Sequence, residues 1–222
     1  YIDAAFGFGE VLHTGRIDVF NLMETHKKYL LKNERFFERE FDYDKLKILN
    51  DGFQYEDIKS KFIVFTEGYG IKKNKYFKDL PLIGTKGELL TIFAPGLKLD
   101  YVLKSSVFII PLGNDLYKIG ATYNWSDRSN NITVEAKEEL LTKLNTFLKC
   151  SYEVVDQVAG IRPTVKDRRP IVGEHPQYKN MFILNGLGTR GVMIGPYVAQ
   201  KLYDFIEMGT PLEAEIDIKR FQ

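Results

Sequence analysis

The chain has 222 residues, a length that allows one large domain or two small ones. Hydrophobic residues make up 44% of it and charged residues 27%, a composition typical of a folded globular protein and unlike that of a disordered chain. The formal net charge is only +1, which gives no general electrostatic reason to bind nucleic acid or an anionic membrane surface.

Cysteine occurs once, at Cys150, which excludes an intramolecular disulfide. The histidines His13, His26 and His175 show no metal-ligand spacing with Cys150 or with one another, so we expect no metal site. The apolar runs are too short to cross a bilayer and no signal peptide is visible, so we expect a cytoplasmic location. The first residue is Tyr1 rather than a methionine, and we therefore expect a piece of a longer protein.

The first quarter of the chain predicts a helix followed by strands. Residues 21–32 place apolar side chains at helical spacing and predict a helix. Strand-like runs follow at residues 36–41 and 46–49. The turn signal Asp51-Gly52 comes next and predicts a hairpin.

The middle of the chain is predicted to be rich in strands. Residues 61–65 (KFIVF) form a continuous apolar run, typical of a strand buried on both faces. Two glycines within residues 66–70 then permit a tight turn with positive φ. Three further runs, at residues 89–93, 107–110 and 116–119, are separated by turn residues and predict an antiparallel meander.

Two amphipathic helices are predicted in the second half. Residues 134–148 carry apolar side chains on one side, and Thr133 is placed to be the N-cap. Residues 192–208 have the same pattern, and Gly209 predicts the end of that helix.

Two glycine-containing motifs distinguish the last third. Residues 158–173 (VAGIRPTVKDRRPIVG) hold an Arg-Pro pair between two glycines, and residues 181–191 (MFILNGLGTRG) run from an apolar strand into three glycines. Backbone N–H groups at the start of the following helix suit an anion or an electron-rich ring edge. The glycine spacing imitates a dinucleotide fingerprint, but too little chain follows for the required βαβ unit, so we reject that interpretation.

In their order, these motifs resemble the D-amino-acid-oxidase-like (DAO) family of FAD-dependent oxidoreductases, of the glycine and sarcosine oxidase type. The resemblance covers nearly the whole chain and rests on the segments GRIDV, FTEGYG, TKGELL, IPLGNDLYKIGATY, GIRPTVKDRRPIVG and NGLGTRGVMIGPYVAQKL. Members of the family begin with a strand and a glycine fingerprint for the ADP pyrophosphate, and this sequence shows neither. The resemblance therefore implies a fragment that lacks its N-terminal FAD-binding segment and is inactive by itself.

The resemblance implies FAD as the cofactor and gives roles to particular residues. Arg162, the arginine of the G-x-R-P motif, matches the family's clamp for the substrate carboxylate and is the candidate catalytic residue. A guanidinium suits that task because its planar fork makes two parallel charge-assisted hydrogen bonds. Arg190 and Tyr123 are the other candidate substrate-binding residues. The candidate FAD-binding residues are Thr66, Gly68, Gly186, Leu187, Gly188, Thr189, Arg190, Gly191 and Val192.

Two charged segments have alternative interpretations. Lys86-Gly87-Glu88 resembles the family's strand beside the flavin, and it reads equally as the charged edge of a strand. Residues 167–169 (DRR) read as an exposed charged loop, which Asp167 fixes by pairing with an arginine.

We predict an α+β fold with a mixed, mostly antiparallel sheet of about six to eight strands and with helices on one face. The strands at 61–65 and 181–185 and the last helix are expected to pack together. The resemblance implies a domain assignment: 1–60 as substrate-domain entry and partial FAD-domain segment, 61–80 as an FAD-domain strand and turn, 81–160 as the substrate-binding domain, and 161–222 as the C-terminal flavin-facing loop and helix.

The function implied is oxidation of an amine next to a carboxylate, with hydride transfer to flavin. The expected partners are a small amine or amino-acid substrate and the missing N-terminal segment of the same protein, with no nucleic acid and no membrane. Three alternatives remain. The enzyme could be a dehydrogenase that passes electrons to a carrier, or one acting on a 2-hydroxy acid or a glycerol phosphate. The chain could also be a non-catalytic ligand-binding module, or a structural or interaction domain.

Overall fold

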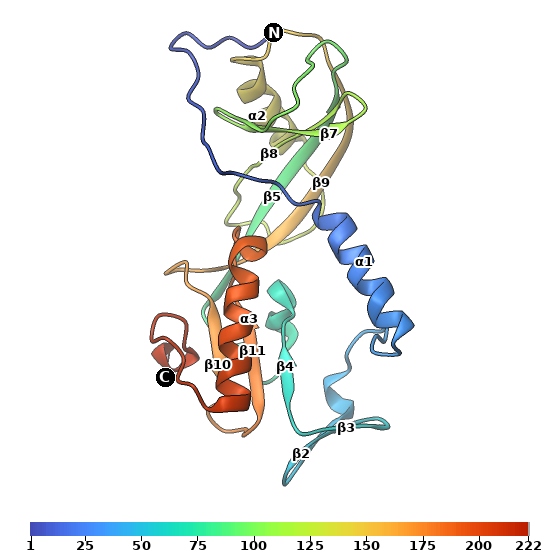
Figure 1. Ribbon diagram of the computed structural model, residues 1–222, viewed down its shortest axis with the longest axis vertical. Coiled ribbons are helices and arrows are strands. Elements are labelled where there is room, and N and C mark those ends of the chain that lie inside the picture. The colour runs from blue at the N-terminus through green and yellow to red at the C-terminus, as the bar shows by residue number, and fades with distance from the viewer. Residues whose placement is uncertain (222) are drawn as a thin grey trace. The chain divides into compact units, whose positions relative to one another are not determined.

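The computed structural model describes residues 1–221, which form two compact units (Figure 1). Unit 1 consists of residues 1–8 and 82–166, and unit 2 of residues 9–81 and 167–221. The chain enters each unit twice, so segments that are distant in sequence form each of the two cores.

Unit 1 is built on a five-stranded antiparallel sheet in the order β6-β7-β8-β5-β9. Its strands are β5 (Leu82–Phe93), β6 (Leu103–Lys104), β7 (Phe108–Gly113), β8 (Leu116–Gly120) and β9 (Glu153–Val165). The two longest strands, β5 and β9, pair from Leu82 opposite Val165 to Phe93 opposite Glu153, with one register shift between Thr91 and Ile92.

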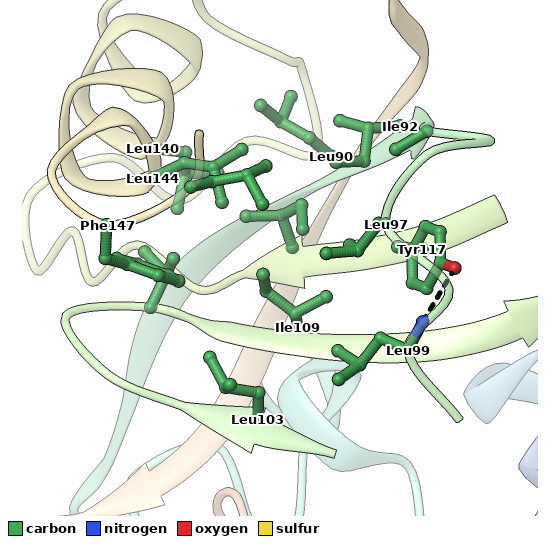
Figure 2. Close-up of a cluster of buried hydrophobic side chains, with 14 residues drawn as sticks. Leu90, Ile92, Leu97, Leu99, Leu103, Ile109, Tyr117, Leu140, Leu144 and Phe147 are labelled. Carbon is green, nitrogen blue, oxygen red and sulfur yellow. Dashed lines mark hydrogen bonds between the residues drawn. The ribbon is translucent and has the colours of Figure 1, made fainter. Parts of the chain in front are cut away.

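Helix α2 (Val134–Asn145) covers one face of this sheet and completes the core of unit 1 (Figure 2). Thr133 is its N-cap, because its side-chain oxygen accepts from the amide of Ala136. Leu140 and Leu144 lie one turn apart on the helix and are fully buried against Leu90, Ile109 and other apolar side chains of the sheet. Removing this apolar surface from water is the main source of stability for the unit.

Unit 2 contains a second, three-stranded sheet in the order β10-β11-β4. Strand β4 (Ile63–Phe65) runs parallel to β11 (Met181–Asn185), which runs antiparallel to β10 (Ile171–Glu174). Helix α3 (Gly191–Met208) packs on this sheet through an apolar stripe that includes Val198 and Leu202. Gly209 ends the helix in the left-handed conformation, with φ of 68°.

The rest of unit 2 precedes and follows that sheet. Helix α1 (Val19–Lys32) contains no buried residue and is capped by Asp18, whose carboxylate accepts from the amide of Asn21. Strands β1 (Leu46–Leu49), β2 (Gly52–Tyr55) and β3 (Ile58–Ser60) form an antiparallel three-stranded sheet. Short 3-10 helices lie at Tyr43–Lys45, Gly68–Lys73 and Ile218–Phe221.

The structure confirms the α+β class, the mostly antiparallel strands and all three helices to within a few residues. The predicted meander is only partly right: β7 pairs with the following strand β8, but β5 lies beside β8 and not beside β7. The packing of the 61–65 segment against β11 is also confirmed. The prediction of one sheet is wrong, because the strands of the described part of the chain divide among three sheets.

Two strand predictions also need correction. Residues 36–41 form no strand, and Val64 of β4 is 41% exposed, so that strand is not buried on both faces. No helix within residues 1–221 is both long and apolar enough to cross a membrane.

Candidate functional site

Arg162 lies on β9 in unit 1, opposite Thr85 of β5. Its side chain is half-buried, and its Nη1 donates to the backbone oxygen of Thr122 at 3.3 Å. The Tyr123 ring lies against the guanidinium, with 4.5 Å between Cζ and the ring centroid. The structure therefore brings two of the predicted substrate-binding residues together.

No carboxylate within residues 1–221 forms an ion pair with Arg162. A guanidinium carries five N–H donors in a planar fork, and the contact with Thr122 uses one of them. A half-buried cation with unused donors is suited to bind an anion that presents two oxygens in one plane.

The segment that carries Thr122 and Tyr123 is attached to β5 by backbone hydrogen bonds. Lys86 and Asn124 exchange two of them, each 2.9 Å long. The amide of Glu88 donates to Thr122 Oγ1 at 2.9 Å, and the amide of Thr122 donates to the Glu88 oxygen at 3.2 Å. These contacts hold in place the two groups that touch the Arg162 guanidinium, which are the Thr122 backbone oxygen and the Tyr123 ring.

Behind that segment, Lys86 and Glu88 form a buried charged cluster on the opposite face of β5 from Arg162. Lys86 Nζ lies 2.5 Å from Asp127 Oδ2 and 3.3 Å from Glu88 Oε1. The Glu88 carboxylate also accepts from the backbone and side chain of Thr133, at 2.9 and 2.8 Å, and from the Gln157 amide at 2.8 Å. The prediction of a charged strand edge is therefore wrong, because the side chains of Lys86 and Glu88 are only 1% and 3% exposed.

Within this cluster, the contacts between the charged groups favour the charged form of each one. The hydrogen bond to Asp127 raises the pKa of Lys86 above its ordinary value, in spite of burial. Burial acts to raise the pKa of the Glu88 carboxyl, but the hydrogen bonds from Thr133, Gln157 and Lys86 outweigh it and bring the pKa below the usual range. The Lys86 hydrogen bond and those from Ser129 lower the pKa of Asp127 to about 2. All three groups are therefore charged at neutral pH.

The second group of predicted residues lies in unit 2, in the loop between β11 and α3. Gly186 and Gly188 have φ of 72° and 56°, conformations that favour glycine. The Asn185 side chain accepts from the Gly186 amide at 2.8 Å and donates to the Gly68 oxygen at 2.9 Å. Asn185 thus connects the loop to the turn that contains Gly68. Asn185 is not among the residues predicted from sequence, although it begins the NGLG motif.

This loop leads directly into the N-terminus of α3. The helix begins at Gly191, and Arg190 at the N-cap position makes no side-chain capping hydrogen bond. Val192 is 50% exposed and Thr189 is also exposed. The Met193 amide donates to the Arg190 backbone oxygen at 3.0 Å, whereas the amides of Gly191 and Val192 have no backbone acceptor among the described residues. These two amides, together with the positive end of the helix dipole, suit an electron-rich group.

Arg190 itself turns toward the loop that follows β9. Its Nη2 donates to the Arg168 backbone oxygen at 2.8 Å, and the residue is exposed. The predicted charged loop is confirmed, because Asp167 pairs with Arg220 at 3.1 Å. Arg220 also donates to the backbone oxygens of Arg169 and Pro170.

The turn at residues 66–68 follows β4 in the same unit. Gly68 has φ of 55°, and Thr66 is exposed. Between them, the Glu67 carboxylate accepts from Asn74 Nδ2 at 2.8 Å and from the Tyr43 hydroxyl. Burial and the bond to Glu67 raise the pKa of Tyr43. Glu67 is therefore occupied in holding the turn.

Within residues 1–221, no cluster of three or more His, Cys, Asp and Glu side chains is arranged to hold a metal ion. Cys150 is a free thiol.

The family model described as FAD dependent oxidoreductase (DAO) matches residues 33–204. Glycine oxidase of Bacillus licheniformis is 27% identical over 153 residues, which cover 66% of this chain and 41% of the relative. A tRNA 5-methylaminomethyl-2-thiouridine biosynthesis bifunctional protein of Campylobacter jejuni is 27% identical over 161 residues, or 70% of this chain and 25% of the relative. The chain thus spans less than half the length of these relatives.

Solved structures show the same fold. Glycine oxidase from Geobacillus kaustophilus superposes with a TM-score of 0.65 at 21% identity, covering 80% of this chain and 50% of that one. Iminodiacetate oxidase from Chelativorans sp. BNC1 gives a TM-score of 0.59 at 23% identity, with coverage of 77% and 50%.

Proposed function

The chain belongs to the DAO family of FAD-dependent oxidoreductases, and we propose that it forms part of an enzyme that oxidises an amine next to a carboxylate. The substrate class is an amino acid or an N-substituted glycine. One observation carries the proposal: Arg162 is a half-buried arginine with unused donors and no carboxylate partner among the described residues. The glycine oxidases among the relatives support the same substrate class.

Arg162 binds the substrate carboxylate in this proposal and so orients the carbon that is oxidised. Two parallel N–H···O bonds fix direction as well as distance, and a lysine ammonium does not offer that geometry. Tyr123 lies against the guanidinium and limits the directions from which the carboxylate reaches it. Correct orientation of a bound substrate can remove much of the activation barrier. Arg162 and Tyr123 therefore act by positioning the substrate.

The flavin-binding residues are those of unit 2: Thr66, Gly68 and the loop Gly186 to Val192, with Arg190 adding positive charge. Their chemistry fits the group, since left-handed glycines and the amides of a helix start present donors to an electron-rich ring edge. Bound to these residues, FAD would supply the acceptor for the hydride of the substrate's Cα–H. Since the cofactor supplies that step, the protein's task is to bind and orient the amine.

We also propose the domain assignment given above, a further FAD-binding segment of the same protein as a partner of this chain, and a cytoplasmic location.

The proposal is tested by visible absorption of the purified, FAD-containing enzyme of which this chain forms part, under anaerobic conditions. We expect glycine, sarcosine or a D-amino acid to bleach the flavin bands. Arg162→Ala is expected to require far more substrate for the same bleaching, whereas Arg128→Ala, which changes an exposed arginine of the same unit, behaves as the wild type. Equal bleaching of wild type and Arg162→Ala by every amine would exclude this role for Arg162.

A further inference from the structure

Gly87 lies in the middle of β5, directly opposite Gly160 of β9. The next pair along the same face is Thr85 opposite Arg162, because directly paired residues of antiparallel strands share a face and side chains alternate along each strand. Arg162 therefore projects from β9 on the face where residue 87 has no side chain.

The Arg162 guanidinium occupies the space that a side chain at position 87 would need. A β-carbon on residue 87 would lie 2.0 Å from Nη2, 2.2 Å from Nη1 and 2.3 Å from Cζ. Non-bonded heavy atoms prefer separations of about 3.5–4.0 Å, so a β-carbon and the present guanidinium position exclude one another. Gly87 does not have positive φ, and the close approach of Arg162 is what requires glycine here.

The backbone around Gly87 has little freedom to relieve such a clash. On one side β5 pairs with β9 through Gly160, and on the other Lys86 exchanges two backbone hydrogen bonds with Asn124. The buried contacts of Lys86 and Glu88 hold the same stretch from the opposite face. An added side-chain carbon would therefore displace the guanidinium rather than the strand.

We propose that Gly87 is a positioning residue: its missing side chain lets the Arg162 guanidinium reach across β5 to the Thr122 oxygen and the Tyr123 ring. This inference rests on the proposed role of Arg162 in carboxylate binding. A displaced guanidinium loses both contacts and presents its donors in other directions. Residue 87 thus acts on substrate through Arg162, without touching the substrate.

The chain offers a matched control in Gly160. It lies on the same face and in the adjacent strand, and a β-carbon there would meet no atom within 4 Å. Gly160 likewise has no positive φ, so Gly160→Ala adds the same methyl group without the clash. Any general effect of replacing a strand glycine by alanine appears in this control.

The experiment measures acetate binding by calorimetry in five forms of the purified protein: wild type, Gly87→Ala, Gly160→Ala, Arg162→Ala and the double variant Gly87→Ala/Arg162→Ala. We expect Gly87→Ala and Arg162→Ala each to weaken acetate binding about tenfold or more, the size of one lost charge-assisted contact. Gly160→Ala is expected to bind as the wild type, and the double variant as Arg162→Ala alone. Wild-type affinity in Gly87→Ala would overturn the inference, as would a further loss of binding in the double variant.

A second readout separates this inference from the proposed function. The midpoint of urea unfolding is expected to fall slightly in Gly87→Ala relative to wild type, because the displaced guanidinium, the flexible end of its side chain, loses its two contacts. It is not expected to fall in the double variant relative to Arg162→Ala, where the guanidinium is absent. If Gly87→Ala does not fold but the double variant does, the conclusion is the same, because the alanine is then tolerated once the Arg162 guanidinium is absent. Normal acetate binding by Arg162→Ala would reject the carboxylate role of Arg162, while the unfolding comparison still decides whether residue 87 positions it. Equal midpoint shifts in both backgrounds would overturn the positioning role.

Discussion

Arg162 and Lys86 lie on opposite faces of the ribbon formed by β5 and β9, and their surroundings differ. Lys86 is buried between two carboxylates, so its charge is neutralised within the protein. Arg162 contacts a backbone oxygen and an aromatic ring instead. The first cation stabilises unit 1, and the second remains available for an anion.

Lys86 is expected to be important for stability. Lys86→Met would leave the buried Glu88 carboxylate without its cation, and breaking a buried pair in this way destabilises a protein by about 3–5 kcal/mol. Lys98→Met is the control, since Lys98 pairs with Asp115 while 70% exposed, and such surface pairs contribute about 0–1 kcal/mol. Urea unfolding followed by circular dichroism measures both. A loss below about 1 kcal/mol for Lys86→Met would show that the cluster does not depend on its cation.

The same cluster predicts the effect of acid. The pKa of Asp127 is about 2 in the folded chain against an ordinary value of 3.8, so its contribution to stability is complete above pH 3.8 and is lost as the pH falls toward 2. The lowered pKa of Glu88 acts in the same direction. We expect the urea midpoint to fall as the pH decreases from 5 to about 2.5, and to fall less steeply in Asp127→Asn. Parallel curves for the two proteins would contradict this account.

At the level of elements, helix α2 depends on the same carboxylate as the sheet. Its N-cap, Thr133, accepts from the Ala136 amide and donates its hydroxyl to Glu88. The cap therefore attaches the helix start to β5, next to the segment that carries Tyr123.

Thr133→Ala removes both contacts. Loss of an N-cap typically costs about 1 kcal/mol, and loss of a hydrogen bond to a charged group costs about as much again, so we expect a decrease of about 2 kcal/mol in the free energy of unfolding. Thr133→Ser keeps the hydroxyl and is expected to retain most of this stability. The measurement is denaturant unfolding, and equal losses in the two variants would refute the role of the hydroxyl.

Elements with strong local signals could be predicted from the sequence. Helices α2 and α3 carry apolar periodicity, with the N-cap Thr133 before α2 and the C-cap Gly209 after α3, and the β1–β2 hairpin carries the Asp51-Gly52 turn. Strand β5 was predicted only over residues 89–93, because Gly84, Lys86, Gly87 and Glu88 have low strand propensity. Pairing with β9, more than 70 residues later, overrides that propensity, and no local pattern reports it.

The candidate site could likewise be predicted only where a local motif marks it. Motif order pointed to Arg162 and to the loop Gly186 to Val192, and the structure shows Arg162 beside Tyr123. It also shows what a linear pattern could not: the space at Gly87 that Arg162 fills, and the link from Asn185 to the Gly68 turn. Both depend on contacts between segments that are far apart in the chain.

At the scale of the whole molecule, family membership and the chemistry of Arg162 support one account. The chain belongs to an FAD-dependent family, and its curated relatives include glycine oxidases. Unit 1 carries the proposed carboxylate site, and unit 2 carries the glycine loop and helix start proposed for the flavin. The proposed function depends above all on recognition of the substrate carboxylate by Arg162.

The most direct test of that claim compares the best amine substrate with its carboxamide, in wild type and in Arg162→Ala, by the ratio of their kcat/KM values. The amide keeps the amine and the oxidised carbon but lacks the negative charge. We predict that wild type prefers the carboxylate by about 100-fold, the equivalent of about 3 kcal/mol, and that Arg162→Ala loses nearly all of this preference. An unchanged ratio in Arg162→Ala would contradict the account, because another group would then recognise the carboxylate.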